Sequence, residues 1–234
     1  MSAIQTSEKP SKRQELREDR MVTLFARAWM FYEENRTLVY SALAGIVLVA
    51  LGAVGYSQYM GQQGEQAEEL LSGIVGQYEA GNYRTALDGT ESQPGLTAIA
   101  EDYGSTRSGN LATFYAADAL YRLGEYDQAL EHFQAFDKTD GFIGASAYAG
   151  QAAIHENRGE YEQAAERYEQ AAAHYPNELT APQHLLDAGR NYEAAGLYGA
   201  ATDAYERISD EYPESALAQQ ADRFVARAQA KQRS

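Results

Sequence analysis

The sequence predicts an all-α protein, a solenoid of helix pairs that follows a single transmembrane helix. Three observations lead to this prediction: an uncharged apolar stretch near the N-terminus, a Gly-x-Tyr-x-x-Ala motif that occurs four times, and Ala-rich stretches on both sides of each motif. We divide the chain into a leader at 1–36, a transmembrane helix at 37–58, a linker at 59–66 and a repeat domain at 67–231.

The apolar stretch is long enough to cross a bilayer. Residues 37–64 carry no charge, and those from Thr37 to Tyr56 are dense in Leu, Val, Ala, Ile and Gly. A helix needs about 20 such residues to span the hydrocarbon core. A core helix of a soluble protein usually shows a polar stripe, which this stretch lacks.

Basic residues predict the orientation of this helix. Arg17, Arg20, Arg27 and Arg36 precede it, whereas the first basic residue after it is Arg84. Because basic flanks stay in the cytoplasm, we expect a single-pass protein of the inner (cytoplasmic) membrane, with the leader inside and the C-terminal domain in the periplasm.

Cleavage as a signal peptide remains an alternative, since Ala53-Val54-Gly55 is an acceptable cleavage site. The 36-residue leader is long for a signal peptide, and it places aromatic side chains at helical spacing, which favours a retained anchor. The residues at this spacing are Val22, Phe25, Ala28, Trp29 and Tyr32.

Charge and cysteine content exclude several classes of function. Residues 65–234 hold 12 Lys and Arg against 28 Asp and Glu, so this part of the chain repels nucleic acid. With no cysteine, disulfides and thiolate chemistry are excluded. The lysine-poor acidic composition fits either a high-salt environment or a high-GC genome.

The Gly-x-Tyr-x-x-Ala motif recurs at steps of 43, 35 and 37 residues, starting at Gly81, Gly124, Gly159 and Gly196. An aromatic residue follows the alanine by four positions in three copies, as Phe133, Tyr168 and Tyr205. Pro176 and Pro213 close the last two copies. Periods of this length indicate stacked units of secondary structure.

Each unit is expected to be two helices joined at the glycine, because the flanking stretches favour helix and glycine permits a tight turn. Examples are 111–123 and 146–158 before the glycine and 161–175 after it. Small residues at Ala129, Ala164 and Ala201 would let the two helices approach, and the following ring would fill the space one turn later.

The pattern resembles the tetratricopeptide repeat over about 67–213, with 214–231 as its capping helix. Small residues in the first helix, at Ala117, Ala152 and Gly189, fall in the register of that family. The first copy departs from it: Thr90 replaces the aromatic residue, and 89–95 breaks the second helix with Gly and Pro. We expect an extra helix and turn at 96–110.

No motif for a metal, nucleotide or nucleophile site occurs, and we expect no cofactor and no enzyme. The resemblance implies instead a groove lined by the first helix of each repeat, suited to an extended or helical peptide. Packing between repeats is the alternative role for Phe114 and Tyr121. The positions carried over are Leu71, Val75, Tyr78, Leu111, Phe114, Asp118, Tyr121, Arg122, Ala149, Ala153, Glu156, Asn157, Gln183, Leu186, Arg190 and Glu193.

The order of leader, span and exported repeats resembles the bacterial ancillary subunits of the Sec translocon, and the stretches 103–112 and 115–133 resemble the versions in Bacteroidetes-like bacteria. That resemblance implies three partners: the translocation channel, a periplasmic prolyl-isomerase chaperone and newly exported chains. Alternatives are an envelope-assembly scaffold for outer-membrane or cell-wall machinery and a membrane-tethered enzyme acting through Glu156 and Glu193.

Overall fold

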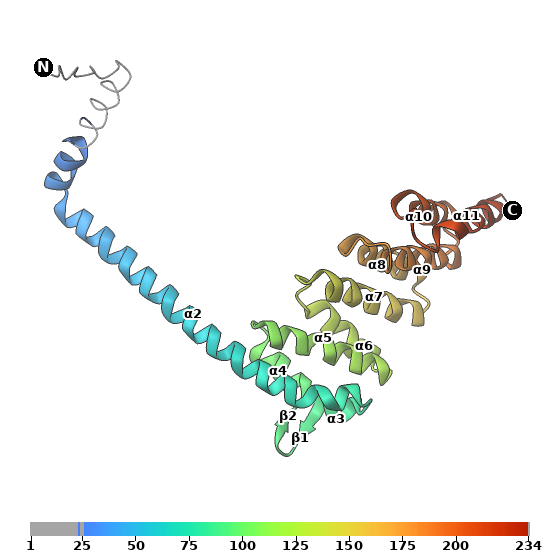
Figure 1. Ribbon diagram of the computed structural model, residues 1–234, viewed down its shortest axis with the longest axis horizontal. Helices are drawn as coiled ribbons and strands as arrows, with labels where there is room; N and C mark the ends of the chain where they lie inside the picture. Colours follow the sequence, from blue (N-terminus) through green and yellow to red (C-terminus); the bar gives the residue numbers. More distant parts are fainter. Residues whose placement is uncertain (1–22, 24–25, 234) are drawn as a thin grey trace, which may run out of the picture. The chain divides into compact units, whose positions relative to one another are not determined.

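A computed structural model of the chain describes residue 23 and residues 26–233 (Figure 1). The chain divides into two compact units at Tyr59 and Met60. The first contains a short helical segment and the start of a long helix, and the second contains the repeats.

The first unit contains the apolar stretch. Residues 26–34 are helical, and α2 (Arg36–Glu79) begins after Asn35. Among the described residues, α2 is the one helix long and apolar enough to cross a membrane, with a mean hydropathy of 2.2 in its most apolar window and none of that window buried. Trp29 is exposed, whereas Val22 and Phe25 lie outside the described residues.

Residues 59–66 are helical, although the sequence predicts a flexible linker there. Gly61 and Gly64 each cost a helix about 1 kcal/mol relative to Ala. The neighbouring Met60, Gln62 and Gln63 favour helix, so α2 continues through both glycines.

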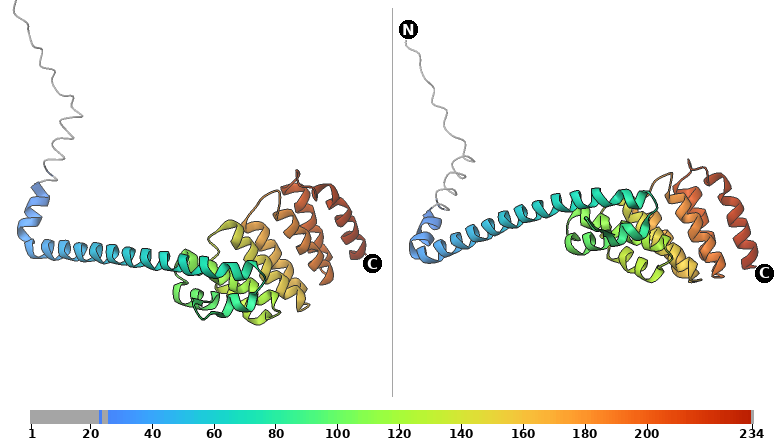
Figure 2. Two further views of the ribbon diagram at one scale, coloured as in Figure 1. Left: turned by 60° about the horizontal axis from the view of Figure 1, so that its bottom comes forward. Right: turned by 90° about the horizontal axis from the view of Figure 1, so that it is seen from below.

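The second unit is an all-α solenoid in which α5 to α11 stack as successive antiparallel helices (Figure 2). The helices after α2 are α3 (Tyr83–Asp88), α4 (Leu96–Tyr103), α5 (Arg107–Arg122), α6 (Tyr126–Ala135), α7 (Gly141–Asn157), α8 (Tyr161–His174), α9 (Ala181–Ala194), α10 (Tyr198–Glu211) and α11 (Ala218–Gln232).

The four motif glycines make the same turn, which confirms the prediction. Gly81, Gly124, Gly159 and Gly196 all have φ between 74° and 79°. In each copy the glycine N–H bonds the carbonyl three residues back, and the next N–H bonds the carbonyl five residues back. This is the Schellman arrangement, in which the left-handed conformation closes the helix end.

The first copy departs from the repeat as predicted. Its second helix, α3, ends at Asp88, and β1 (Gly89–Thr90) pairs antiparallel with β2 (Gln93–Pro94) before α4 begins. Leu96 and Ile99 of α4 are fully buried, and α4 packs against α5. The two-stranded hairpin was not predicted.

Small residues and rings at the motif positions form the core, again as predicted. Ala86, Ala129, Ala164 and Ala201 are fully buried. The ring of Tyr205 covers Gly189, where an added Cβ would lie 2.2 Å from a ring carbon. Phe133 covers Gly150 of the next helix in the same way, at 2.4 Å. These contacts let neighbouring helices approach closely.

Helix α7 lies between two core clusters, and this explains why its sequence is apolar on all sides. Ala147 and Ile154 belong to the cluster of the first two copies, and Ala152 belongs to the cluster of the last two copies and α11. A helix with neighbours on both faces has no wide solvent-exposed stripe.

Two first helices begin earlier than predicted. Helix α5 begins at Arg107, where Thr106 caps it by accepting a bond from the Gly109 N–H at 3.0 Å. Helix α7 begins at Gly141, capped by Asp140 through the Ile143 N–H at 3.1 Å. Both caps are ordinary N-cap residues. The capping helix α11 begins at Ala218, four residues after the predicted start.

The turn glycines predict a matched pair of substitutions. Gly124→Ala should destabilise the chain by about 1–2 kcal/mol, because a Cβ is strained at positive φ. Gly76→Ala, inside α2 with open space around it, should stabilise it by about 0.5–1 kcal/mol. Thermal unfolding of the full chain in detergent, followed by circular dichroism, measures both changes. Equal effects would contradict the assigned turn.

The contact between Gly189 and Tyr205 predicts a second pair. Gly189→Ala should cost about 1–3 kcal/mol, because the fully buried Tyr205 ring must move to admit the methyl group. Gly199→Ala is the control, since its Cβ would meet only the Gln232 side chain at 3.6 Å. The same unfolding measurement compares them, and an unchanged midpoint for Gly189→Ala would rule out close packing there.

Candidate binding groove

The predicted groove residues lie on the first helices of the repeats, α2, α5, α7 and α9. Several of them bond one another across neighbouring helices. The Tyr78 hydroxyl donates to Asp118 Oδ2 at 2.5 Å, and Arg122 Nε donates to the same oxygen at 2.5 Å. These three predicted residues therefore form one cluster between α2 and α5.

Burial and the neighbouring carboxylate shift the pKa values of Tyr78 and Arg122 in this cluster. Burial raises the pKa of Tyr78, and the hydrogen bond to Asp118 raises it further. The same carboxylate raises the pKa of Arg122. The Tyr78 phenol therefore remains a neutral donor near neutral pH, and its bond to Asp118 joins α2 to α5.

The next contact joins α5 to α7. Asn157 Nδ2 donates to the Tyr121 hydroxyl at 3.3 Å, and the Tyr121 ring packs against Tyr126 at 5.5 Å between centroids. Phe114 packs against Phe133 and Phe136, with centroids 5.9 and 5.6 Å apart. Phe114 therefore packs within its own repeat, whereas Tyr121 contacts the next repeat through Asn157. Both Phe114 and Tyr121 remain half-buried.

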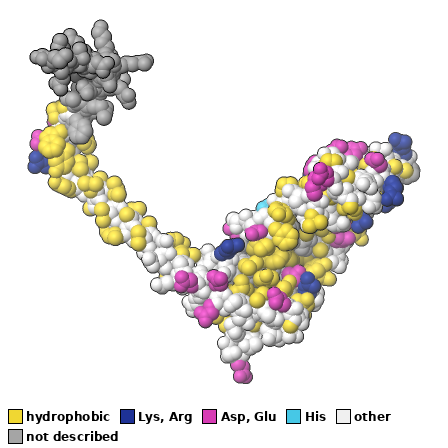
Figure 3. All heavy atoms as spheres, viewed as in Figure 1, with side chains coloured by type: hydrophobic (Ala, Val, Ile, Leu, Met, Phe, Trp, Pro, Cys, Tyr) yellow, Lys and Arg dark blue, Asp and Glu magenta, His cyan; other side chains and the backbone are white. Residues whose placement is uncertain are grey.

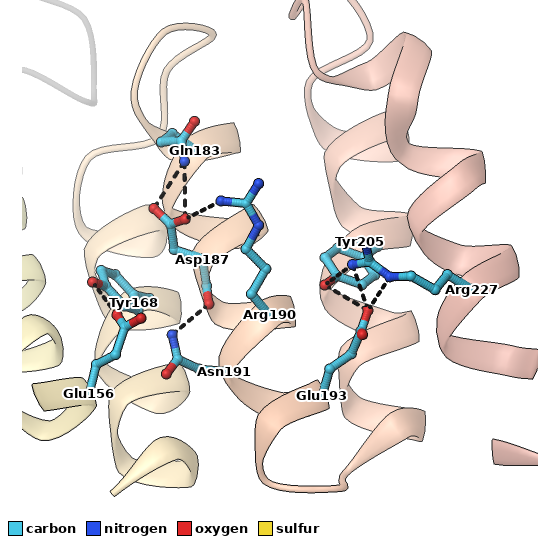
Figure 4. Close-up of polar contacts among 9 residues, drawn as sticks. All are labelled: Glu156, Tyr168, Gln183, Asp187, Arg190, Asn191, Glu193, Tyr205 and Arg227. Atoms are coloured by element: carbon cyan, nitrogen blue, oxygen red, sulfur yellow. Dashed lines mark hydrogen bonds and ion pairs between the residues drawn. The ribbon is translucent and has the colours of Figure 1, made fainter. Parts of the chain in front are cut away.

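Glu156 and Glu193 hold the second helix of their own repeat (Figure 4). The Tyr168 hydroxyl donates to Glu156 at 3.1 Å, and the Tyr205 hydroxyl donates to Glu193 at 3.0 Å. Burial raises the pKa of Tyr205 to about 12, with Glu193 as the next cause. The two carboxylates occupy equivalent repeat positions, so each serves packing within its own repeat.

Glu193 also bonds the capping helix α11. Arg227 Nη2 and Lys231 Nζ of α11 lie 2.8 and 2.7 Å from its carboxylate, whose side chain is only 7% exposed. Burial alone would raise the pKa of Glu193, but the hydrogen bonds from Lys231, Arg227 and Tyr205 lower it overall. The structure therefore assigns Glu193 contacts to α10 and α11, and its binding role stays a prediction.

Gln183 and Arg190 of α9 converge on Asp187, a residue that the groove prediction missed (Figure 4). Gln183 Nε2 lies 3.0 Å from Asp187 Oδ2, and Arg190 Nη1 lies 3.3 Å from Oδ1. Their spacings of four and three residues on one helix are the signal that could have found Asp187. Arg190 is exposed but already has this carboxylate partner.

The remaining predicted residues differ in exposure. Leu186 is 3% exposed and Leu71 is 7% exposed, so both belong mainly to the core. Their positions face a neighbouring helix because each first helix packs on two sides. Val75, Leu111, Ala149 and Ala153 are half-buried.

Two surface hollows lie beside the N-terminal half of α5, one next to the start of α7 and the other next to α2. One has a volume of about 460 Å³ and is lined by Arg107, Asn110, Leu111, Phe136, Thr139, Asp140 and Ile143. The other has a volume of about 370 Å³ and is lined by Glu68, Leu71, Ser72, Val75, Arg107, Ser108, Leu111 and Tyr115. Arg107 and Leu111 line both, so the hollows adjoin; we call them together the α5 trough.

The α5 trough contains three predicted groove residues, Leu71, Val75 and Leu111. Arg107 and Ile143 were not predicted, because α5 and α7 begin about one turn before the expected starts of these first helices. Phe136 follows α6 and lies outside the first helices to which the groove prediction was confined. The capping residues Thr106 and Asp140 were the available signal. No group of three or more His, Cys, Asp or Glu suited to a metal occurs in the described part of the chain.

Comparison with known families supports the repeat interpretation. Residues 111–139, 146–178 and 185–215 each match the tetratricopeptide repeat family. Each match covers one helix pair: α5 with α6, α7 with α8, and α9 with α10. This part of the chain is a tetratricopeptide repeat solenoid, and such repeats indicate a protein–protein interaction scaffold. No characterised protein matches the sequence.

The pKa of Glu193 predicts how acid affects stability. Because this pKa is lowered below its ordinary value of 4.5, the ionised carboxylate stabilises the folded chain above about pH 4.5, and this contribution is lost as the pH falls through the folded-state value. Glu193→Gln should therefore lower stability at pH 7 by about 1.5–3 kcal/mol, because bonds to charged groups are lost. The difference from wild type should shrink below pH 4.5.

Thermal unfolding of the full chain from pH 7 to 3 measures this dependence. Glu156→Gln is the matched control, since the equivalent carboxylate bonds Tyr168 but no residue of α11. A difference between wild type and Glu193→Gln that stays constant over this range would show that the ionised carboxylate does not fasten α11.

Proposed function

We propose that the chain is a membrane-anchored protein-binding scaffold, in which α2 crosses the inner membrane near residues 37–58 and the repeat domain lies in the periplasm. One observation carries the proposal: a tetratricopeptide solenoid is joined in the same chain to an apolar helical stretch that no described residue covers. An uncovered apolar helix of this length would be unfavourable in water.

The basic residues before the span support the orientation with the leader in the cytoplasm. Trp29 is exposed on the helical segment just before α2, as expected for an aromatic side chain at the lipid headgroups. An anchor also confines the repeats to a layer beside the membrane, which raises their effective concentration for membrane-bound partners.

We further propose that the partners belong to protein export: the Sec translocation channel, a periplasmic prolyl-isomerase chaperone and newly exported chains. Support comes from the order of leader, span and repeats and from the stretches 103–112 and 115–133, which resemble the ancillary translocon subunits. The envelope-assembly scaffold is the alternative, and the second experiment below decides between them.

The absence of cysteine allows a direct test of topology. Gln163 is an exposed residue of α8, so Gln163→Cys should react in intact spheroplasts with a maleimide that cannot cross membranes. Ser2→Cys, in the leader, should react only after the membrane is opened. The reverse pattern would overturn the orientation. A mature chain whose intact mass corresponds to a start at Tyr56, after Gly55, would replace the anchor by a cleaved signal peptide.

Photo-crosslinking in the native membrane tests the partners. A photoreactive residue at Leu111, in the α5 trough, should give products with the channel, the chaperone or exported chains, whereas the same residue at Gln163 on α8 should not. Products with cell-wall enzymes in place of the channel would overturn the export proposal in favour of envelope assembly.

A further inference from the structure

We infer that the α5 trough binds a protein segment in which apolar side chains flank a single acidic side chain, whose carboxylate pairs with Arg107. This inference rests on the proposed protein-binding function and specifies its ligand. It depends on three features: the apolar lining, the state of Arg107 and the charges at the two ends of the trough.

Apolar side chains line the trough on both sides of Arg107. Leu71, Val75 and Tyr115 lie in one hollow, Phe136 and Ile143 lie in the other, and Leu111 belongs to both. Each hollow falls in the range of about 300–1,000 Å³ that is common for binding pockets. Hydrophobic side chains gather over α5 and α7 in the space-filling view (Figure 3).

The far wall of the trough is held in place before any ligand arrives. Asn110 Nδ2 donates to the Asp137 carbonyl at 2.9 Å, and the Asp137 N–H donates to Asn110 Oδ1 at 2.8 Å. This reciprocal pair fixes the segment that carries Phe136 and Thr139. A preformed wall lowers the entropic cost of binding.

Arg107 differs from most arginines of the repeats. Arg84, Arg122, Arg158, Arg190, Arg207 and Arg227 each pair with a carboxylate. Arg107 is exposed, and within residues 26–233 no carboxylate forms an ion pair with it. Its guanidinium is therefore available to an incoming acidic side chain.

The position of Arg107 at a helix N-terminus also favours binding of an anion. It is the first residue of α5, a helix with no acidic residue in its first turn. A cation at a helix N-terminus is disfavoured by the helix dipole. A carboxylate placed there would meet both the guanidinium and the favourable end of the dipole, so the local field selects an anion.

The surrounding charges limit the ligand to one acidic group. Glu68 lies at one end of the trough and Asp140 at the other. The domain as a whole has a large excess of Asp and Glu, so a segment with several carboxylates would be repelled. The complementary charge pattern is one acid at the centre with neutral or basic residues on both sides.

The test uses the full chain in lipid nanodiscs and a random library of 12-residue peptides displayed on phage. Selection should enrich peptides with one Asp or Glu between apolar residues. For a synthetic copy of the leading peptide, Arg107→Gln should weaken binding about tenfold. Replacing the peptide's acid by its amide should weaken wild-type binding to a similar extent and have little further effect on Arg107→Gln.

Arg223→Gln is the matched control, because Arg223 is an exposed arginine of α11 that lies outside the trough and bonds Gln220 rather than a carboxylate. It should bind the peptide as wild type does. Arg107→Gln should keep the wild-type melting temperature or raise it, since it removes a cation from a helix N-terminus. A loss of affinity therefore cannot be assigned to unfolding.

Other outcomes separate this inference from the proposed function. Enriched peptides without an acidic residue, or binding that Arg107→Gln leaves unchanged, would overturn the trough assignment while the scaffold function stands. If no peptide is enriched by the wild-type chain, the trough assignment falls, and the scaffold function then depends on the crosslinking result alone.

Discussion

The solenoid depends on close contact between an aromatic ring and a small residue on the neighbouring helix. Tyr205 over Gly189 and Phe133 over Gly150 leave no space for even a Cβ, so they set the distance between the helices. At that distance the motif alanines fit between the paired helices, where they are fully buried. The motif glycine, in the left-handed conformation, ends the first helix and lets the second helix of the repeat pack back against it. Interiors packed this tightly tolerate little change in volume.

The ring at the motif position also correlates with the polar side chain that faces it from the first helix of the repeat. Tyr168 and Tyr205 bring a hydroxyl with them, and the equivalent first-helix positions hold Glu156 and Glu193 as acceptors. In the second copy the ring is Phe133, which needs no acceptor, and the equivalent position is Tyr121. Much of the inner polar surface thus satisfies buried hydroxyls. Surface for a ligand is left beside the N-terminal half of α5, where the trough lies.

Sequence alone predicted the features that local chemistry dictates: the glycine turns, the helix pairs, the break after Leu87 and the capping helix. It did not predict contacts that distant residues decide. Glu193 is a predicted groove residue, and Arg227 and Lys231 bond it from more than 30 residues away in the sequence. No periodicity reveals such a partner. The early starts of α5 and α7 could have been predicted from the sequence, because Thr106 and Asp140 are common N-cap residues. The register of the repeat motif instead indicated later starting positions for both helices.

The arginines show how a structural surface and a binding surface can be told apart in an acidic domain. Where acids outnumber bases, a guanidinium readily finds a carboxylate, and most arginines of the repeats have done so. An exposed arginine without such a partner, placed where the helix dipole opposes it, contributes little to the fold. The unfavourable interaction between this arginine and the helix dipole is offset only when the guanidinium pairs with an anion of a ligand. If the scaffold is held beside a membrane, as we propose, even a modest gain of this kind would suffice, because the effective concentration of membrane-bound partners would be high.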